Sequence, residues 1–576
     1  MRHGPRPAWS PLGLLLLLLL ATSCATPGGG AKAVLAAPGL KKLINGCPAD
    51  RLELPAPPGF TPEFTVIQLN DIYRIGPVRG GRAGGLSRVA ALVEKTRAEG
   101  KPVFIMHAGD FLFPSLEGEL FGGRMMVDAL NYLDRELKGG EESTRGELLA
   151  VPGNHEFDEG AGPLVEALER SEFRWIASNL ELTGEASGVA DKLEKDALVQ
   201  MGGMKVGIFA LTIEDGPKGK DFARVPEGYS EAASKRLEEL ERRGAEVLIG
   251  LTHLRMTDDV PLLRELQRRH PKLLWIAGGH EHTCMYSQEL GLVTKGDANA
   301  VRVWRLVFGR DGEGAPALRA EMIPLTEAFE TSGDYNASVW TPSLKELEAK
   351  LPGYSEAIGR AQVPLEAREQ CIRNVETNFG NYLTDLMRAE AGPTGPGEST
   401  LGAVNGGLIR LDDSVDGELS GEFLERTLGF AAPVCRAEVK GSDVKKLLEY
   451  SVSGNPGEGR FMQVSGLRFT FTRERLPNRR VTSVEVGDVR SGFSPLDEDK
   501  TYVLMTLERI MKKLEEPGGR KGYPLTCGRD LKELLREGLR KESNGIAPRK
   551  EGRITELNGA DHCPEPMADS TPSNSR

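Results

Sequence analysis

Short apolar runs alternate with amphipathic stretches along the first half of the chain. The runs have the length and composition of buried strands, and the stretches between them repeat their apolar residues at helical spacing. The predicted strands are 64–69, 102–106, 148–151, 174–177, 205–211, 246–251 and 272–277, and the predicted helices are 86–97, 125–137, 162–170, 231–243 and 260–269. This alternation predicts an α/β domain with a largely buried sheet, which we place at residues 61–335.

The pattern changes beyond residue 335. A charged helical stretch at 344–351 predicts a linker helix within residues 336–363. Residues 364–558 then mix helical patterns, at 381–391 and 442–450, with short strand patterns such as 468–471 and 501–505. They predict a second domain, so the chain as a whole is α+β. The polar tail 559–576 has the composition of a disordered segment.

The N-terminus has the pattern of an export signal. Arg2 and Arg6 precede the apolar run Leu14 to Leu20, and small residues lead to Cys24. The apolar run is too short for a transmembrane helix, and the cysteine resembles a bacterial lipobox. We predict a signal peptide at 1–23, a lipid anchor on Cys24, a flexible tether at 24–60, and a periplasmic or cell-surface lipoprotein of a bacterium. The alternative is simple cleavage that leaves Cys24 free or in a disulfide.

Composition limits the possible partners and the compartment. The 576 residues are 39% hydrophobic and 27% charged, with a formal net charge of −11. This charge argues against a nucleic acid polymer as partner but allows small anionic substrates. Apart from Cys24 there are six cysteines, an even number that suits disulfides in an oxidising compartment, although the sequence does not give their pairing.

Polar side chains follow five of the apolar runs where each run ends. They are Asp71, Asp110, Asn154, His253, and the pair His280 and His282. Ligands of open α/β sheets bind beyond the carboxyl ends of the strands, so these groups can converge in space. Carboxylate, amide and imidazole ligands without thiolate suit zinc, manganese or iron, and one aspartate can bridge two such ions.

These motifs resemble those of calcineurin-like metallophosphoesterases, and in particular of the secreted 5′-nucleotidase and UDP-sugar hydrolase family. The matching stretches are Leu69-Asn70-Asp71, Ala108-Gly109-Asp110, Gly153-Asn154-His155-Glu156-Phe157-Asp158, Thr252-His253 and Gly279-His280-Glu281-His282. The resemblance implies a metallophosphoesterase sandwich domain followed by a 5′-nucleotidase-type C-terminal domain.

The resemblance also implies a role for each matching residue. Asp71, Asp110 and His282 would bind one metal, and Asp110, Asn154, His253 and His280 the other, with Asp110 as the bridge. His155, oriented by Asp158, would stabilise the transition state. Glu156 has no role in this scheme.

The first motif departs from the family at Tyr73. The family usually has a histidine there, whereas this chain reads Asp71-Ile72-Tyr73. A tyrosine can coordinate a metal as phenolate, which favours ferric iron, or it can simply pack. We include Tyr73 among the predicted ligands and leave the identity of the metals open.

The resemblance extends to the second domain. It implies that Arg373 and Arg410 bind phosphate, that Asn405 binds the base or sugar, and that Phe461 and Tyr523 stack on the base. Guanidinium groups match phosphate geometry, and aromatic planes stack on any base. The alternatives are that Arg373 forms a surface ion pair and that Phe461 is a core residue.

Together these features predict an exported two-metal phosphohydrolase. It would release phosphate from nucleoside 5′-monophosphates by attack of a metal-bound hydroxide. Alternatives of the same fold are a 2′,3′-cyclic nucleotide phosphodiesterase, a UDP-sugar hydrolase and a thiosulfate-ester hydrolase. An alternative of another class is a nucleotide-binding lipoprotein that has lost turnover through the change at Tyr73.

Overall fold

The computed structural model describes residues 43–288, 291–392, 399–429, 431–513, 522–559 and 563. The predicted signal peptide, Cys24 and most of the C-terminal tail lie outside these residues. Within them, no helix is long and apolar enough to span a membrane.

The first domain contains two large sheets. The eight-stranded sheet has the order β2 (Leu52–Leu54), β17 (Pro316–Pro324), β16 (Arg302–Arg310), β3 (Thr61–Leu69), β4 (Val103–His107), β5 (Leu148–Ala150), β6 (Arg174–Ile176) and β8 (Leu193–Glu194). The seven-stranded sheet has the order β1 (Asn45–Gly46), β14 (Met285–Ser287), β15 (Leu292–Lys295), β13 (Leu273–Gly278), β12 (Val247–His253), β10 (Met204–Thr212) and β9 (Asp196–Met201).

A closely packed apolar core joins the two sheets. Side chains of the eight-stranded sheet, such as Phe64, Met106 and Phe308, belong to the same buried cluster as Ile249 and Trp275 of the seven-stranded sheet. The rings of Phe64 and Phe308 stack with centroids 4.9 Å apart. Both faces of the central strands are therefore buried, which explains why these strands appear in the sequence as continuous apolar runs.

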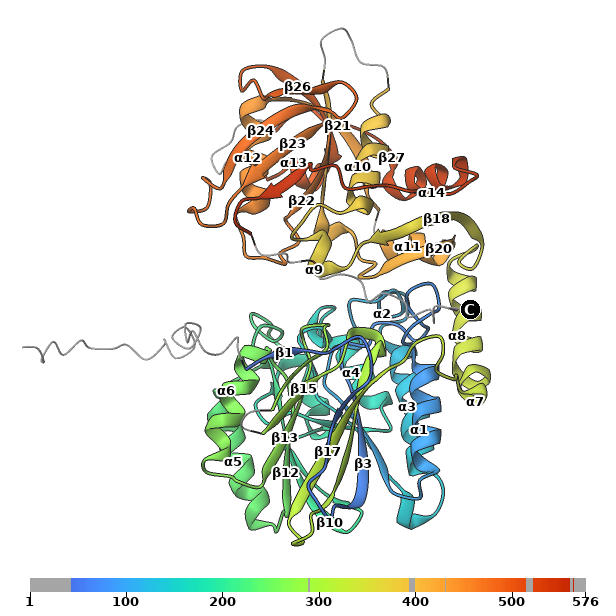
Figure 1. The fold of residues 1–576 in the computed structure, drawn as a ribbon, viewed down its shortest axis with the longest axis vertical. Coiled ribbons are helices and arrows are strands. Elements are labelled where there is room, and N and C mark those ends of the chain that lie inside the picture. Colours follow the sequence, from blue (N-terminus) through green and yellow to red (C-terminus); the bar gives the residue numbers. More distant parts are fainter. Residues whose placement is uncertain are drawn as a thin grey trace, which may run out of the picture. The chain divides into compact units, whose positions relative to one another are not determined.

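Helices cover the outer faces of the sheets. Helices α1 (Leu86–Arg97), α3 (Arg124–Lys138) and α4 (Ala161–Arg170) pack on the eight-stranded sheet, and α5 (Tyr229–Arg242) and α6 (Met256–Gln267) flank the other sheet (Figure 1). The amphipathic pattern of each helix matches its burial, since the buried residues of α1 and α3 face the sheet. The domain is a four-layer sandwich.

The second domain is built on smaller sheets. Its five-stranded sheet has the order β22 (Met462–Ser465), β19 (Thr400–Asn405), β26 (Thr501–Leu507), β21 (Pro433–Lys440) and β27 (Thr526–Asp530). Helices α10 (Asn378–Ala389), α12 (Gly441–Val452) and α14 (Leu531–Lys541) join its core. The side chain of Thr377 accepts a hydrogen bond from the Gly380 amide at 3.0 Å, which caps α10 at the start.

Two short elements lead from the first domain to the second. Helix α8 (Thr341–Lys350) lies inside the predicted linker, and strand β18 (Ala357–Glu366) pairs with β20 (Ser414–Ser420) of the second domain. Strand pairing therefore begins inside the predicted linker, before residue 364.

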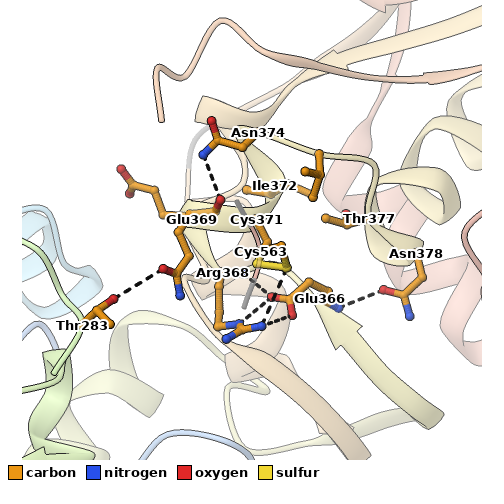
Figure 2. Close-up of a disulfide and its surroundings, with 12 residues drawn as sticks. Thr283, Glu366, Arg368, Glu369, Cys371, Ile372, Asn374, Thr377, Asn378 and Cys563 are labelled. Atoms are coloured by element: carbon orange, nitrogen blue, oxygen red, sulfur yellow. Dashed lines mark hydrogen bonds and ion pairs between the residues drawn. A yellow bond between two sulfur atoms is a disulfide. The ribbon is translucent and has the colours of Figure 1, made fainter. Parts of the chain in front are cut away.

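Three disulfides are present among the described residues. They join Cys47 to Cys284, Cys371 to Cys563 and Cys435 to Cys527. Figure 2 shows the second of them beside Arg368, whose guanidinium forms an ion pair with Glu366 at 2.6 Å. The six cysteines other than Cys24 are thus all paired, in agreement with their even number.

The structure differs from the predicted tether at its C-terminal part. Residues 45–46 and 52–54 form strands β1 and β2, and Cys47 is bonded to Cys284. The many Ala, Gly and Pro residues of this segment suggested a flexible tether, but backbone pairing with β14 and β17 and the disulfide fix its C-terminal part to the domain.

Candidate active site

The predicted metal ligands lie at one edge of each large sheet. Strands β3, β4 and β5 are parallel neighbours, and β12 and β13 are parallel neighbours in the other sheet. Parallel strands present their carboxyl ends at the same edge, so the residues that follow them meet. Asp71 and Asp110 come from one sheet, and His253 and His280 from the other.

Four of the predicted ligands adopt a left-handed backbone. The φ angles are 54° at Asp71, 58° at Asp110, 92° at His280 and 55° at His282. Side chains other than glycine rarely adopt these angles, and such residues cluster at functional sites. The turns after the strands therefore aim these side chains at a common point at a cost in backbone energy.

Glycines allow the loops to approach one another closely. A Cβ atom on Gly109 would lie 2.6 Å from Nδ1 of His253, and one on Gly153 would lie 2.1 Å from Oδ1 of Asp110. Neither position has room for a side chain. The glycines of the Ala108-Gly109-Asp110 and Gly153-Asn154 motifs thus serve the packing of the ligand loops.

Asp110 lies at the centre of the ligand cluster. Its Oδ2 atom is 3.1 Å from the hydroxyl of Tyr73 and 3.1 Å from Nε2 of His253. Its Oδ1 atom accepts a hydrogen bond from the amide of His155 at 2.8 Å. The side chain of Asp110 is 1% exposed, so its charge requires a partner of opposite charge.

The remaining ligands surround Asp110 on both sides. Oδ1 of Asn154 lies 3.1 Å from Nε2 of His253 and 2.9 Å from Nδ1 of His280. On the other side, Nε2 of His282 lies 3.0 Å from the Tyr73 hydroxyl and 3.6 Å from Oδ1 of Asp71. The predicted grouping of ligands into two sets sharing Asp110 is compatible with these distances.

Carboxylates of the cluster favour positive charge at two of its histidines, His253 and His282, whereas burial and the charge of His253 lower the pKa of His280. Burial lowers the pKa of His253, but the carboxylates of Asp110 and Asp71 outweigh it and raise the pKa to about 9. Burial also lowers the pKa of His282, and the carboxylates of Asp412 and Asp71 raise it to about 10. The same negative field would stabilise a bound metal cation.

The side chains present fit a metal site. Ligand atoms of Asp71, Asp110 and His253 all lie within 4.8 Å of one another, and all three residues are buried. Their oxygen and nitrogen atoms suit zinc, manganese or iron. Nδ1 of His253 is 2.7 Å from the carbonyl oxygen of Ala108, which leaves Nε2 facing the cluster, as is usual for metal-binding histidines.

His155 and Asp158 lie beside the ligand cluster. Nδ1 of His155 is 2.6 Å from Oδ2 of Asp158, and the His155 side chain remains 32% exposed. Burial lowers the pKa of His155, but the carboxylates of Asp110 and Asp158 outweigh it, and the pKa is raised. This geometry suits an imidazole that donates a hydrogen bond to an anionic group in the cavity.

Two cavities open onto these residues. One has a volume of about 820 Å³, and its lining includes Asp110, His155, His280 and His282. The other, of about 200 Å³, is lined by Tyr73, His155 and His282 together with Arg373 and Arg410 of the second domain. Both cavities place His155 and His282 within reach of a small ligand.

Comparison with known proteins identifies both domains. Residues 64–284 match the model of calcineurin-like phosphoesterases, and residues 357–515 match that of the 5′-nucleotidase C-terminal domain. Snake venom 5′-nucleotidase of Crotalus adamanteus is 26% identical over 494 residues, which cover 77% of this chain and 80% of that protein. The 5′-nucleotidase of Mus musculus is 25% identical over 486 residues, covering 76% and 81%.

A solved structure supports the same assignment. The 5′-nucleotidase precursor of Thermus thermophilus has 25% identity and a TM-score of 0.65, over 86% of this chain and all of that one. The chain belongs to the 5′-nucleotidase family of calcineurin-like phosphoesterases. This confirms the resemblance, the two-domain fold and the prediction of a metal-dependent phosphoric ester hydrolase.

Glu156 acquires a structural role in this 5′-nucleotidase family site. Its side chain is 0% exposed and accepts hydrogen bonds from the backbone amides of Asp110, Phe111, Leu112 and Gly153. One carboxylate therefore ties the Asp110 loop to the Asn154 loop. Burial and the charge of Asp110 raise the pKa of Glu156 to about 7. The motif already contained Glu156, but nothing in the sequence indicated which amides it would bind.

The second domain supplies a contact that the sequence did not indicate. Oδ2 of Asp412 lies 3.1 Å from Nδ1 of His282, and Oδ1 of Asp412 accepts a hydrogen bond from the backbone amide of Glu369 at 2.7 Å. A carboxylate on the far ring nitrogen orients a metal-binding histidine and raises its basicity. Asp412 lies two residues after Arg410, but it is not part of the matched motifs and does not end a predicted strand, so the sequence did not indicate this contact.

The predicted substrate residues divide into two groups. Arg373 and Arg410 line the 200 Å³ cavity, although the Arg373 guanidinium also pairs with Glu369. Asn405, Phe461 and Tyr523 are absent from the linings described for both cavities. Phe461 is 2% exposed in the core of the 5′-nucleotidase C-terminal domain, which agrees with the alternative that it is a core residue.

Polar groups already engage the other two residues. The side-chain amide of Asn405 donates to the Gly459 carbonyl oxygen at 2.9 Å, and the Tyr523 hydroxyl bonds Asp443. Contacts of this kind hold the side chains in place but do not point to a nucleoside. Their predicted roles stay predictions.

Proposed function

We propose that this member of the family is an exported two-metal phosphohydrolase that releases phosphate from nucleoside 5′-monophosphates. The observation that carries the proposal is the meeting of seven ligand-type side chains at the strand ends, directly beside the His155–Asp158 pair. The relatives named above are 5′-nucleotidases, which supports this substrate class.

Each set of residues has a distinct task in this scheme. Asp71, Tyr73, Asp110 and His282 would hold one metal, and Asn154, His253 and His280 would share Asp110 to hold the other. Bound there, the metals supply a nucleophile at neutral pH and polarise the phosphoryl group.

The remaining residues act on the substrate directly. His155 donates a hydrogen bond to the phosphoryl oxygen on which negative charge develops, and Asp158 keeps the imidazole in that orientation. Arg373 and Arg410 offer guanidinium groups to the phosphate. Asp412 holds the ring of His282 from the far side.

Phosphate release from a substrate panel tests the activity. The purified full chain is treated with chelator and then supplied with Mn²⁺, Zn²⁺ or iron. We expect nucleoside 5′-monophosphates to have a higher kcat/KM than a 2′,3′-cyclic nucleotide or a UDP-sugar. A higher kcat/KM for a cyclic nucleotide or a UDP-sugar would assign the enzyme to that substrate class instead. No phosphate release from any substrate of the panel would favour a protein that only binds nucleotides.

Export and anchoring rest on the sequence of the N-terminus. In a bacterial host, the wild-type chain should incorporate labelled fatty acid and fractionate with membranes. A Cys24→Ser variant should lose the label. Equal labelling of both chains would contradict a lipid anchor on Cys24.

A further inference from the structure

A buried cluster of three charged residues lies behind the histidine loops. Lys295, at the end of β15, is 1% exposed, and its ammonium lies 2.6 Å from Oε2 of Glu281 and 3.0 Å from Oδ2 of Asp259. Lys295 pairs in register with Gly278, the last residue of β13. None of the reaction steps proposed above uses these three charges.

The ammonium also binds the backbone next to two predicted ligands. It donates to the carbonyl oxygen of Leu254 at 2.5 Å and to that of Gly279 at 2.7 Å. Leu254 directly follows His253, and Gly279 directly precedes His280. One side chain thus joins the two loops that carry these histidines.

The two carboxylates extend the same connection. Asp259 accepts a hydrogen bond from the hydroxyl of Thr252 at 2.7 Å, one residue before His253. Glu281, between His280 and His282, accepts a hydrogen bond from the backbone amide of Met256, the first residue of α6 after the His253 loop. Each carboxylate therefore binds both Lys295 and a residue next to the loop that carries His253.

The cluster is tightly packed and has little room to rearrange. A Cβ atom on Gly278 would lie 2.8 Å from Cε of Lys295 and 2.9 Å from Oδ2 of Asp259. Buried ion clusters contribute little net stability compared with apolar side chains of similar volume. Stability alone is therefore a weak explanation for three charges at this place.

We propose that Lys295 is a positioning residue that fixes the spacing of His253 and His280, and thereby the affinity of the metal held by Asn154, His253 and His280. The inference rests on the proposed two-metal site. Lys295 acts through the Leu254 and Gly279 carbonyl groups and does not touch substrate.

A titration of the chelated full chain with Mn²⁺ tests this role. Wild type should bind about two ions, and Lys295→Met should weaken one of them about 10- to 100-fold, as loss of supporting contacts typically does, while the other changes little. In electron paramagnetic resonance, the signal of a coupled Mn²⁺ pair should give way to that of isolated Mn²⁺.

Two further variants separate positioning from folding. Arg305→Met removes another buried cation of the same domain, one that pairs with Glu99 and Glu321. It should lower thermal stability and leave both affinities unchanged. The triple variant Asp259→Asn, Lys295→Met, Glu281→Gln leaves no unpaired buried charge, and it should still show the selective loss if Lys295→Met fails to fold.

The outcomes distinguish this inference from the proposed function. Failure of wild type to bind two ions would overturn the two-metal site itself. Two ions in wild type, with unchanged affinities in the Lys295 variants, would overturn the positioning role alone. The positioning role would also be overturned if Arg305→Met and the Lys295 variants all lowered the affinity of both ions equally.

Discussion

The two domains hold their predicted site residues in different ways. In the first domain, ligands follow the ends of parallel strands, and four of them adopt the left-handed backbone. In the second domain, the predicted residues are spread over a helix end, a strand end and loops. Arg373 pairs with Glu369, and Phe461 is buried in the core.

This difference shows where a fold determines function. The carboxyl edge of a parallel sheet gathers side chains whose direction the backbone fixes, and contacts such as that of Glu156 with four amides stabilise them. A long exposed side chain such as that of Arg410 keeps more rotamer freedom than the buried ligands of the first domain. Changes in the first domain should therefore affect catalysis more than changes in the second.

The largest effect is expected at Asp110. Asp110→Asn removes the charge shared by both proposed metals, and metals contribute several kcal/mol to such reactions, so kcat should fall about 1,000-fold or more. Metal content, measured by mass spectrometry, should fall as well. Asp128→Asn, which removes a partly exposed carboxylate that pairs with Arg170, should leave both quantities unchanged. An Asp110→Asn protein with both metals and full activity would rule out the bridge.

His155 should have the next largest effect. His155→Ala removes one donor to the developing charge, so kcat should fall about 100- to 1,000-fold with metal content unchanged. His270→Gln, at a buried histidine that pairs with Glu241, is the control and should keep its activity. Loss of metal together with activity in His155→Ala would instead place His155 among the ligands.

Arg410 tests the second domain. Arg410→Ala removes a charged hydrogen bond of about 1.5–3 kcal/mol, so KM should rise about 10- to 100-fold while kcat changes little. Arg436→Ala, which removes an arginine paired with Glu438 on β21, is matched for charge. If kcat rather than KM fell in Arg410→Ala, the arginine would act in the chemical step, and the contrast between the domains would weaken.

Tyr73 should show the smallest effect. Burial and the carboxylates of Asp110 and Asp71 raise the pKa of Tyr73 well above its ordinary value, so without a metal its hydroxyl keeps its proton. We expect Tyr73→Phe to weaken one metal about 10-fold, about 1.4 kcal/mol, and Tyr73→His to restore it. Tyr132→Phe, at a partly buried tyrosine of α3 whose ring packs edge-on against Tyr335, is the control and should leave metal affinity unchanged. Unchanged metal affinity in Tyr73→Phe would show that the ring only packs.

Much of the first domain could be predicted from its sequence. Buried strands such as 64–69 and 205–211 appear as continuous apolar runs, and the polar residues that follow them mark the site. The predicted bounds of helix 86–97 agree with the structure. Strands β16 and β17 were not predicted, since they lie beyond the part of the sequence in which apolar runs alternate with helical patterns.

The supporting contacts could not be predicted. Lys295 and Asp412 lie 42 and 130 residues from the histidines they support, His253 and His282, and only the fold brings them together. The pairing of the three disulfides could not be predicted either, because cysteine spacing does not encode connectivity. The segment around Cys47 resembled a free tether because it is rich in Ala, Gly and Pro and its disulfide to Cys284 could not be predicted.

The requirement for metal tests the central claim most directly. Chelated full chain is supplied with increasing equivalents of Mn²⁺, and hydrolysis of a nucleoside 5′-monophosphate is measured at each step. The account predicts little activity without metal and a plateau at about two equivalents per chain. Full activity after chelation, or a plateau at a single equivalent, would contradict a two-metal site.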